Sequence, residues 1–445
     1  MTNPYLQGLL APVTEEVTAH DLPVTGRVPS GLRGRYLRIG PNPIGIEDDP
    51  SYHWFLGDGM VHGVRLRDGR AEWYRNRWVR SKKVAERLGE PWPAGPVVEN
   101  FDMAPNTNVI AHNGDTLALV EAGARPYRLD DELRTLGPCD FGGTLKGGYT
   151  AHTKADPETG ELHAVGYFFG WEHLEYTVLS ASGEITRSVE IPVSDGPMVH
   201  DFALTRKYVI IYDLPITFSM AMAEAGARLP YAWNDAHPAR VGVMPRDGGA
   251  DDVRWIDIPP CWVFHTLNAY DDGDQVVVDL ARFPSFLHGG RLEGNPPPTL
   301  DRWTIDPAAG KVVQETVDDR AQEFPRVDER LSTRRHRYGY TVTAEAAVQN
   351  QAGEGMMKHD YRGGSSETRL FPAGSGVGEA VFVPSAPDSA EDDGYLMALV
   401  FDPVRGATDL VIIASQDFTG EPVATVHLPV RVPLGFHGSW APDPS

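Results

Sequence analysis

Cysteine and long apolar runs are scarce in this sequence. Only Cys139 and Cys261 occur among 445 residues, and they form no C-x-x-C pair. Two free thiols in a reducing compartment are therefore expected. No eighteen apolar residues follow one another, which excludes a transmembrane helix but leaves peripheral membrane contact open. The first ten residues lack the basic and apolar regions of a signal peptide, so a cytoplasmic location is expected.

Positive charge is also in short supply. The chain has 40 Lys and Arg against 62 Asp and Glu, giving a formal net charge of −22. An acidic chain without a basic stripe repels phosphate backbones, so nucleic acid is not an expected partner. No strand is followed by a G-x-G-x-x-G or P-loop pattern, and strands do not alternate with helices. These absences argue against a doubly wound nucleotide-binding sheet.

Turn residues and short apolar runs are abundant. There are 46 Gly and 37 Pro, and they bound short segments rich in Val, Ile, Tyr and Trp. Such segments predict strands: 116–120, 162–168, 175–179, 208–212, 253–258, 275–280, 337–342, 380–383, 396–401, 410–414 and 423–428. Short helices are predicted over 83–88 and 218–227, and an exposed loop over 384–394. The pattern is typical of a large all-β protein, a propeller or a barrel. No break in composition divides the chain, so one domain over 1–445 is expected, and no repeat fixes the number of blades.

Four of the fifteen histidines each close or adjoin an apolar run: His152, His200, His265 and His437. Taken singly, such a histidine is more often a hydrogen-bonded structural residue than a metal ligand, because no local motif such as H-E-x-x-H joins them. A propeller, however, brings the inner strands of distant blades together around one axis. Widely spaced histidines can therefore converge there.

Several ordered segments resemble the carotenoid cleavage oxygenase family. They are L-R-I-G-P-N-P (37–43), W-F-L-G-D-G-M-V-H (54–62), N-T-N-V (106–109), A-H-T-K-A-D-P (151–157), M-V-H-D-F (198–202), E-F-P-R (323–326), G-E-A-V-F-V-P (378–384) and G-F-H-G (435–438). The resemblance covers about residues 25–440. It implies a seven-bladed β-propeller, with loops and short helices capping one face and one Fe(II) on the axis beneath them.

The resemblance also implies roles for individual residues. The four histidines named above match the four iron ligands of the family. Glu121, Glu323 and Glu379 match the glutamates that accept hydrogen bonds from three of these rings, and we expect them to orient His200, His265 and His437. Such partners fix the tautomer and orientation of a ligand ring. His152 is expected to stand outside this carboxylate set.

Weaker expectations concern the surroundings of the iron. Thr107 matches a position that crowds one open coordination site, although an ordinary strand threonine is nearly as good a reading. Phe55 and Phe264 match aromatic positions near the substrate, where their π faces can stabilise developing positive charge, or they are simply core. Val120 stands where stilbene-cleaving relatives carry a lysine that binds a 4-hydroxyl group. Valine cannot donate a hydrogen bond to a phenolate.

The function that the resemblance implies is Fe(II)-dependent cleavage of a C=C bond by O2, giving two carbonyl products. A small apolar alkene is the expected partner, and a carotenoid or apocarotenoid is favoured over a stilbene or phenylpropene because of Val120. Isomerisation in place of cleavage stays open. A non-catalytic propeller binding module and a Ca²⁺ or Zn²⁺ propeller hydrolase are the alternatives from other classes. Four imidazoles suit iron, whereas Ca²⁺ prefers oxygen ligands.

Overall fold

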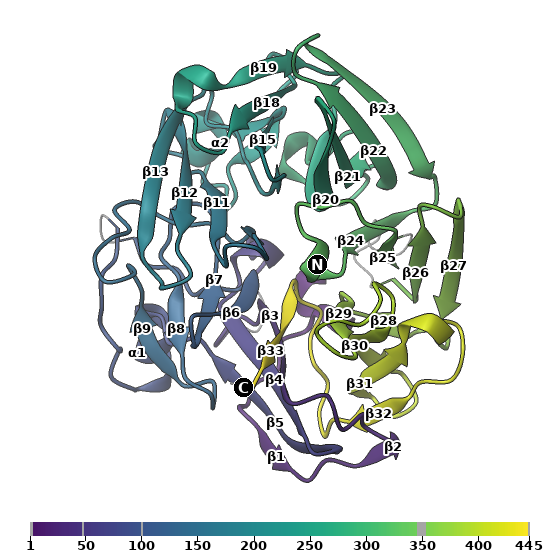
Figure 1. Cartoon of the computed structure of the whole chain (residues 1–445). Coiled ribbons are helices and arrows are strands. Elements are labelled where there is room, and N and C mark those ends of the chain that lie inside the picture. Colours follow the sequence, from purple (N-terminus) through teal and green to yellow (C-terminus); the bar gives the residue numbers. More distant parts are fainter. Residues whose placement is uncertain (1–2, 47–48, 99–100, 345–352, 444–445) are drawn as a thin grey trace.

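Seven antiparallel sheets stand around a central axis in the computed structural model, which describes residues 3–46, 49–98, 101–344 and 353–443 (Figure 1). The architecture is a seven-bladed β-propeller, as the resemblance implied. Short turns join neighbouring strands of most blades. A smaller two-stranded sheet, β16 (Ile216–Phe218) with β17 (Tyr231–Trp233), is inserted in the fourth blade.

The blades are described from the axis outward. The first contains β33 (Gly438–Pro442), β3 (Gly34–Pro41), β4 (Gly59–Arg67), β5 (Arg70–Trp78) and β1 (Thr18–His20). The second contains β6 (Asn108–His112), β7 (Asp115–Leu119), β8 (Tyr127–Leu129) and β9 (Thr135–Pro138). The third contains β10 (Thr153–Ala155), β11 (Leu162–Gly166), β12 (His173–Leu179) and β13 (Ile185–Pro192). The fourth contains β14 (Phe202–Leu204), β15 (Tyr208–Asp213), β18 (Arg240–Pro245) and β19 (Arg254–Asp257).

The remaining blades follow the same plan. The fifth contains β20 (Trp262–Asp272), β21 (Gln275–Phe283), β22 (Thr299–Asp306) and β23 (Lys311–Asp318). The sixth contains β24 (Gln322–Arg326), β25 (Tyr338–Thr343), β26 (Gly355–Asp360) and β27 (Ser365–Leu370). In the seventh, β28 (Gly376–Val377) and β29 (Val381–Pro384) both pair with β30 (Gly394–Asp402), followed by β31 (Ala407–Ala414), β32 (Ala424–His427) and β2 (Val24–Gly26).

Two strands from opposite ends of the chain close the ring. The C-terminal strand β33 pairs with β3, so it forms the inner strand of the first blade. The N-terminal strand β2 pairs with β32 and completes the outer edge of the seventh blade. Figure 1 shows the purple and yellow ends of the chain side by side in this region. Hydrogen bonds between strands from the two ends of the chain therefore close the ring, in place of a covalent link.

The outermost strand of a blade is more exposed than the strands that it covers. The outer strand β13 alternates half-buried and exposed residues over most of its length, whereas β3 is buried throughout. Apolar faces of neighbouring blades pack together, and the largest core cluster joins the third, fourth and fifth blades. This packing of sheet against sheet accounts for the many short, strongly apolar segments in the sequence.

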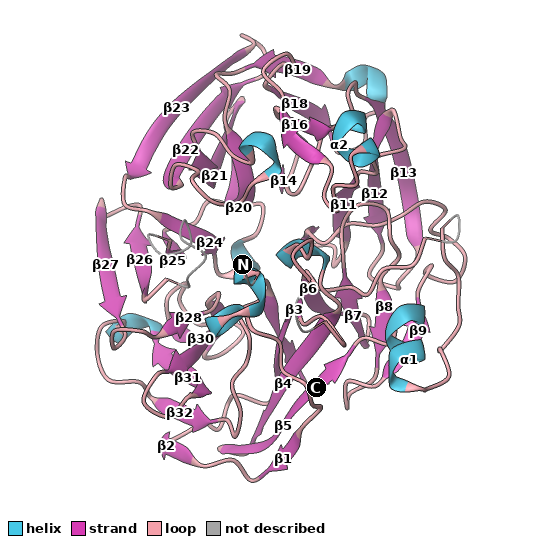
Figure 2. Ribbon diagram, turned by 180° about the vertical axis from the view of Figure 1, so that it is seen from behind, coloured by secondary structure: helices cyan, strands magenta, loops and turns pink. Residues whose placement is uncertain are grey.

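The predicted strands are all present, with ends shifted by a few residues. The first predicted helix is α1 (Lys82–Leu88), which begins after the N-cap Ser81 and ends at Gly89 in the left-handed conformation. The second, predicted over 218–227, was too long: α2 covers only Met220–Glu224, because Phe218 belongs to β16. Short 3-10 helices lie at Pro4–Leu6, Gly8–Leu10, Trp54–Leu56, Ala250–Asp252, His288–Gly290, Glu329–Leu331 and Ser415–Asp417. Figure 2 shows these short helices between the strands.

The segment between β29 and β30 is largely exposed, as expected for the loop 384–394. No helix among the described residues is long and apolar enough to cross a membrane. That the whole chain forms one domain remains a prediction.

Candidate metal centre

The inner strand of each blade brings one polar residue to the axis. Thr107, His152, His200 and His437 come just before β6, β10, β14 and β33, respectively. His265 lies within β20, and Glu323 lies within β24. Glu379 occupies the turn between β28 and β29. Residues up to 330 positions apart in the sequence, such as Thr107 and His437, thus meet: the Thr107 carbonyl accepts a hydrogen bond from the His437 backbone N–H.

The four histidines form one cluster. One ring nitrogen from each lies within 4.8 Å of those from the other three. The Nε2 atom of His200 lies 2.9 Å from Nε2 of His152 and 3.2 Å from Nε2 of His265. His152, His200 and His437 are buried, and His265 is nearly so. The sequence reading that grouped these four residues is therefore matched by their geometry.

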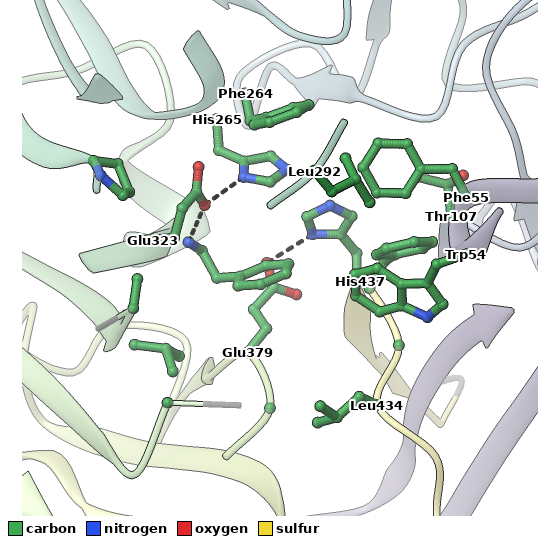
Figure 3. A pocket seen from close by; sticks show the side chains of 18 of the residues that line it. Trp54, Phe55, Thr107, Phe264, His265, Leu292, Glu323, Glu379, Leu434 and His437 are labelled. Carbon is green, nitrogen blue, oxygen red and sulfur yellow. Dashed lines mark hydrogen bonds and ion pairs between the residues drawn. The ribbon is translucent and has the colours of Figure 1, made fainter. Parts of the chain in front are cut away.

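Three of the rings are paired with carboxylates through their other nitrogen. His200 Nδ1 lies 2.9 Å from Glu121 Oε2, His265 Nδ1 lies 2.5 Å from Glu323 Oε2, and His437 Nδ1 lies 2.9 Å from Glu379 Oε1. Figure 3 shows two of these pairs, with the Glu323 and Glu379 carboxylates beside their rings. Each pair directs Nδ1–H to a carboxylate and leaves Nε2 as a lone-pair donor towards the axis.

His152 differs from the other three rings. Its Nδ1 has no carboxylate partner among the residues that the structure describes, as expected from the sequence. Burial and the neighbouring histidines His200, His437 and His265 lower the pKa of His152 well below the ordinary value. A neutral imidazole is the form that binds a metal ion.

Irregular backbone places two of the site residues. The register of β20 against β21 shifts between Val263 and Thr266, around His265. The register of β24 against β25 shifts between Glu323 and Arg326, and Phe324 between them has a φ of 51°. Side chains three positions apart point to opposite faces of a regular strand, but a bulge can re-aim them. Here both side chains point towards the axis: Glu323 contacts His265, and Arg326 contacts Glu379.

The carboxyl groups have unlike surroundings. Burial raises the pKa of Glu323 to about 8, and its Oε1 atom is buried without a hydrogen-bond partner. Burial also acts on Glu379, but the charge of Arg326 and hydrogen bonds from His437 and the Gly438 N–H outweigh it and hold the pKa of Glu379 at about 2. Glu379 is therefore ionised, whereas a positive charge placed near His265 would stabilise the ionised form of Glu323.

The donor set fits a divalent transition-metal ion. Nitrogen ligands bind such an ion at about 2.0–2.1 Å, so two of them on one ion lie within about 4 Å of each other. The Nε2 separations of 2.9 and 3.2 Å are within that limit. Because Nδ1 of three rings faces a carboxylate, their Nε2 lone pairs point to the centre of the cluster, where one ion would bind them. Imidazole suits iron, cobalt, copper and zinc, and suits Mg²⁺ or Ca²⁺ poorly.

An apolar cavity of about 200 Å³ opens onto the cluster. Its wall contains His200, His265 and His437 together with aromatic and aliphatic side chains: Leu10, Trp54, Phe55, Phe264, Phe283, Phe286, Leu292, Phe324, Val342, Leu434 and Phe436. Phe264 meets the Phe55, Phe283 and Phe286 rings edge to face, with centroids 4.9–6.4 Å apart. Such a wall binds a flat apolar molecule and excludes water.

Of the four residues with weaker sequence expectations, three line this cavity and one does not. Thr107, Phe55 and Phe264 line it, as does Glu121. Val120 is buried with 2% exposure and is not among the lining residues. Its neighbour Glu121 reaches the wall, and a role of Val120 beside the substrate stays a prediction. The segment 214–229, which includes the predicted helix 218–227, contributes no residue to this lining either.

Sequence reasoning missed other parts of the site. Arg326 was quoted within E-F-P-R but given no role, and Trp54, Phe283 and Phe286 were not singled out. The aromatic residues carry no sequence signal that separates a cavity wall from ordinary core. Arg326 offered a weak signal, because it follows a site glutamate by three residues. Only the bulge makes that spacing meaningful.

Fold and site together define a β-propeller with a buried all-histidine centre beside an apolar cavity. A family model described as retinal pigment epithelial membrane protein matches residues 10–442. A carotenoid cleavage oxygenase from Mycobacterium tuberculosis is 49% identical, with 99% of this chain and 98% of the relative covered. The chain belongs to the carotenoid cleavage oxygenase family and is an enzyme of that oxygenase type.

Solved structures agree over almost the whole chain. Lignostilbene dioxygenase from Pseudomonas brassicacearum superposes with a TM-score of 0.89 at 30% identity, covering 99% of each chain. Cobalt-substituted apocarotenoid oxygenase from Synechocystis has a TM-score of 0.86 at 28% identity, covering 97% of each chain. An enzyme is thus favoured over the non-catalytic binding module.

Proposed function

We propose that this protein is an Fe(II)-dependent dioxygenase that cleaves one C=C bond of a conjugated apolar alkene into two carbonyl products. The observation that carries the proposal is the convergence of one ring nitrogen from each of four histidines, three of which line an apolar cavity. His152, His200, His265 and His437 would hold the metal ion. Glu121, Glu323 and Glu379 would fix three of the rings.

When bound, an iron ion supplies the O2 chemistry of the reaction. The protein supplies the rest. Four neutral rings leave the ion its full double charge, and the hydrogen bonds to the glutamates keep Nδ1 protonated and Nε2 free. The aromatic wall around Phe264 orients a flat alkene and keeps water out of the cavity. Thr107, which lines the cavity, would limit what fits beside the metal.

A carotenoid or apocarotenoid is the proposed substrate. Away from the histidines and glutamates the lining is mainly aromatic and aliphatic, and aromatic faces suit a long conjugated chain. The identity of 49% to the M. tuberculosis carotenoid cleavage oxygenase supports this class. Val120 lacks the amine that stilbene-cleaving relatives use on a phenol, and it lies outside the lining residues.

Cleavage of a stilbene or phenylpropene is the second candidate. The similarity to lignostilbene dioxygenase, with a TM-score of 0.89, is the observation that favours it. Both substrate classes need an apolar cavity, so the cavity wall alone does not separate them.

One experiment addresses both candidates. Iron-loaded protein is incubated in air labelled with ¹⁸O2 with a panel of apocarotenoids and 4-hydroxystilbenes, and the products are weighed by mass spectrometry. Shortened aldehydes carrying the label from the apocarotenoids are expected. Cleavage of the hydroxystilbenes alone would transfer the proposal to the second candidate, and unlabelled isomers would refute cleavage.

A cytoplasmic location and peripheral membrane contact belong to the same proposal. Phe169 and Met220 are 47% and 62% exposed, and Phe169 stacks on Phe218 next to α2. Such side chains suit contact with a lipid surface that holds an apolar substrate. Co-sedimentation with neutral phosphatidylcholine vesicles, compared between the native chain and Met220→Ser, tests this.

A further inference from the structure

Arg326 occupies a position between three inner strands that the function above does not use. It ends β24 in the sixth blade. Its Nη1 atom donates to Glu379 Oε2 at 3.0 Å, in the seventh blade, and to the Gly438 carbonyl at 3.1 Å, in the closing strand β33. One guanidinium thus connects the two blades on either side of the ring closure with a third.

The Glu379 carboxylate has hydrogen-bond donors at both of its oxygens. Glu379 Oε1 faces His437 Nδ1 at 2.9 Å, and Oε2 accepts from the Gly438 N–H at 3.0 Å as well as from Arg326. Glu379 is 3% exposed, so these bonds are made away from water. Buried, charge-assisted hydrogen bonds hold direction better than neutral ones. In Figure 3 a dashed line joins the Glu379 carboxylate to the His437 ring.

The other two glutamates have hydrogen-bond donors but no cation beside them: Glu121 accepts from the Tyr167 hydroxyl, and Glu323 Oε2 accepts from the Phe324 N–H. Glu323 Oε1 has no partner among the described residues, and Glu121 is the most exposed of the three, at 18%. Neither makes an ion pair with an arginine or lysine in the described chain. His437 is also the ligand that stands directly before the strand that closes the propeller. His437, the ligand next to the strand that closes the propeller, is therefore the one whose glutamate partner also binds an arginine.

We propose that Arg326 is a positioning residue for the metal centre, acting through Glu379 on His437. The inference rests on the proposed metal site. Arg326 holds the Glu379 carboxylate in its orientation, and it ties that carboxylate to β33. Its loss would leave a buried carboxylate without its cation and free His437 to tilt. We expect the cost to fall on metal retention more than on folding.

The variants separate these effects. Arg326→Met removes the charge, Arg326→Lys keeps a charge with a single donor centre, and Glu379→Gln removes the carboxylate. Arg330→Met is the matched control, because Arg330 in the same blade pairs with buried Asp328 and with carbonyls of residues 386–390, away from the histidines. The dissociation constant for Co²⁺ is measured by competition with a chromogenic chelator, and the visible spectrum of the bound Co²⁺ reports ligand geometry.

Arg326→Met is expected to weaken Co²⁺ binding by about ten- to a hundredfold and to change the Co²⁺ spectrum, with Arg326→Lys intermediate. In the Glu379→Gln background the same substitution should weaken binding by less than about threefold, because the mediating carboxylate is gone. Arg330→Met should lower the unfolding temperature while leaving the Co²⁺ constant unchanged.

Three results would overturn the proposal: native affinity in Arg326→Met, multiplicative losses in the double variant, or equal losses in Arg330→Met. If Arg326→Met does not fold, Arg326→Lys decides the case through its affinity and spectrum. Failure of the native protein to bind Co²⁺ at all would instead refute the metal site itself.

Discussion

The Nε2 atoms of His152 and His200 lie 2.9 Å apart, although the two rings come from different blades. His200 is committed to Glu121 through Nδ1, so its Nε2 carries a lone pair. Two buried lone pairs at that distance repel each other unless a proton or a cation lies between them. A metal ion is the partner that all four rings of the cluster can share, and the contribution of each residue to holding it can be measured.

Replacing His265 by Ala should abolish metal binding and turnover. The substitution removes one of four ligands and leaves Glu323, whose carboxyl is buried, without its ring partner. Metal content after purification under nitrogen, and product formation, are the measurements. His112→Ala is the control, because His112 bonds the Ser180 carbonyl at the edge of the second blade. Full metal content with normal turnover in His265→Ala would refute the ligand role.

The two conservative glutamate variants should differ. Glu323→Gln keeps an amide oxygen for His265 Nδ1–H and should lower metal affinity or activity by about ten- to a hundredfold while keeping the fold. Glu379→Gln should cost more, because both oxygens of Glu379 face donors and the amide NH2 must oppose one of them. Chelator competition on both variants checks the order. Equal and negligible losses would remove the glutamates from the site.

Acid should weaken the fold through buried neutral histidines. Burial, with the charges of Arg38 and Arg431, lowers the pKa of His62 to about 3, and its Nδ1 lies 2.9 Å from the Tyr74 hydroxyl. Below pH 6.5 the unfolded chain binds a proton at this residue that the folded chain does not. The free energy of unfolding therefore falls as pH drops from about 6.5 towards 3, by about 1.4 kcal/mol per pH unit from this group.

Urea unfolding at pH 7 and pH 5 measures this effect. His62→Gln should lose about 2 kcal/mol less than the native chain over that interval. The same substitution at the exposed His20 serves as the control. Identical acid sensitivity in the native chain and in His62→Gln would contradict the assignment of the lowered pKa to His62.

Phe55 should help to select the cleaved bond. Its ring meets Phe264 and Phe436 edge to face in the cavity wall, with centroids 6.4 and 5.8 Å apart. Phe55→Ala should give a broader set of products and lower kcat/KM by about tenfold, corresponding to about 1.4 kcal/mol. Mass spectrometry of the products is the readout. Phe371→Ala, which alters an aromatic side chain packed in another core cluster, should leave the product pattern unchanged.

Much of the fold could be predicted from the sequence. Short apolar segments between Gly, Pro and Asp predicted the strands, and the ordered motifs from L-R-I-G-P-N-P to G-F-H-G carried the resemblance that implied seven blades. The start of the helix predicted over 218–227 was wrong, because β16 pairs with β17 and takes Phe218 out of the helical segment. Pairing between residues 13 to 17 positions apart outweighed local helix propensity.

The site was predicted as a set of residues but not as a geometry. His152, His200, His265 and His437 could be named from motifs, and so could their three glutamates. Val120 was singled out because stilbene-cleaving relatives carry a lysine at its position, and in the structure it is buried behind the wall that Glu121 lines. Arg326 stayed without a role, because its reach to Glu379 depends on the bulge at Phe324.

By itself the sequence determined which residue types stand at the start of each inner strand, since these follow from local patterns and ordered motifs. Tertiary structure alone decided which of them meet. Distances between residues hundreds of positions apart depend on the closing of the ring through β33 and on bulges in β20 and β24. Such features arise from the packing of whole blades, and no short stretch of sequence contains them.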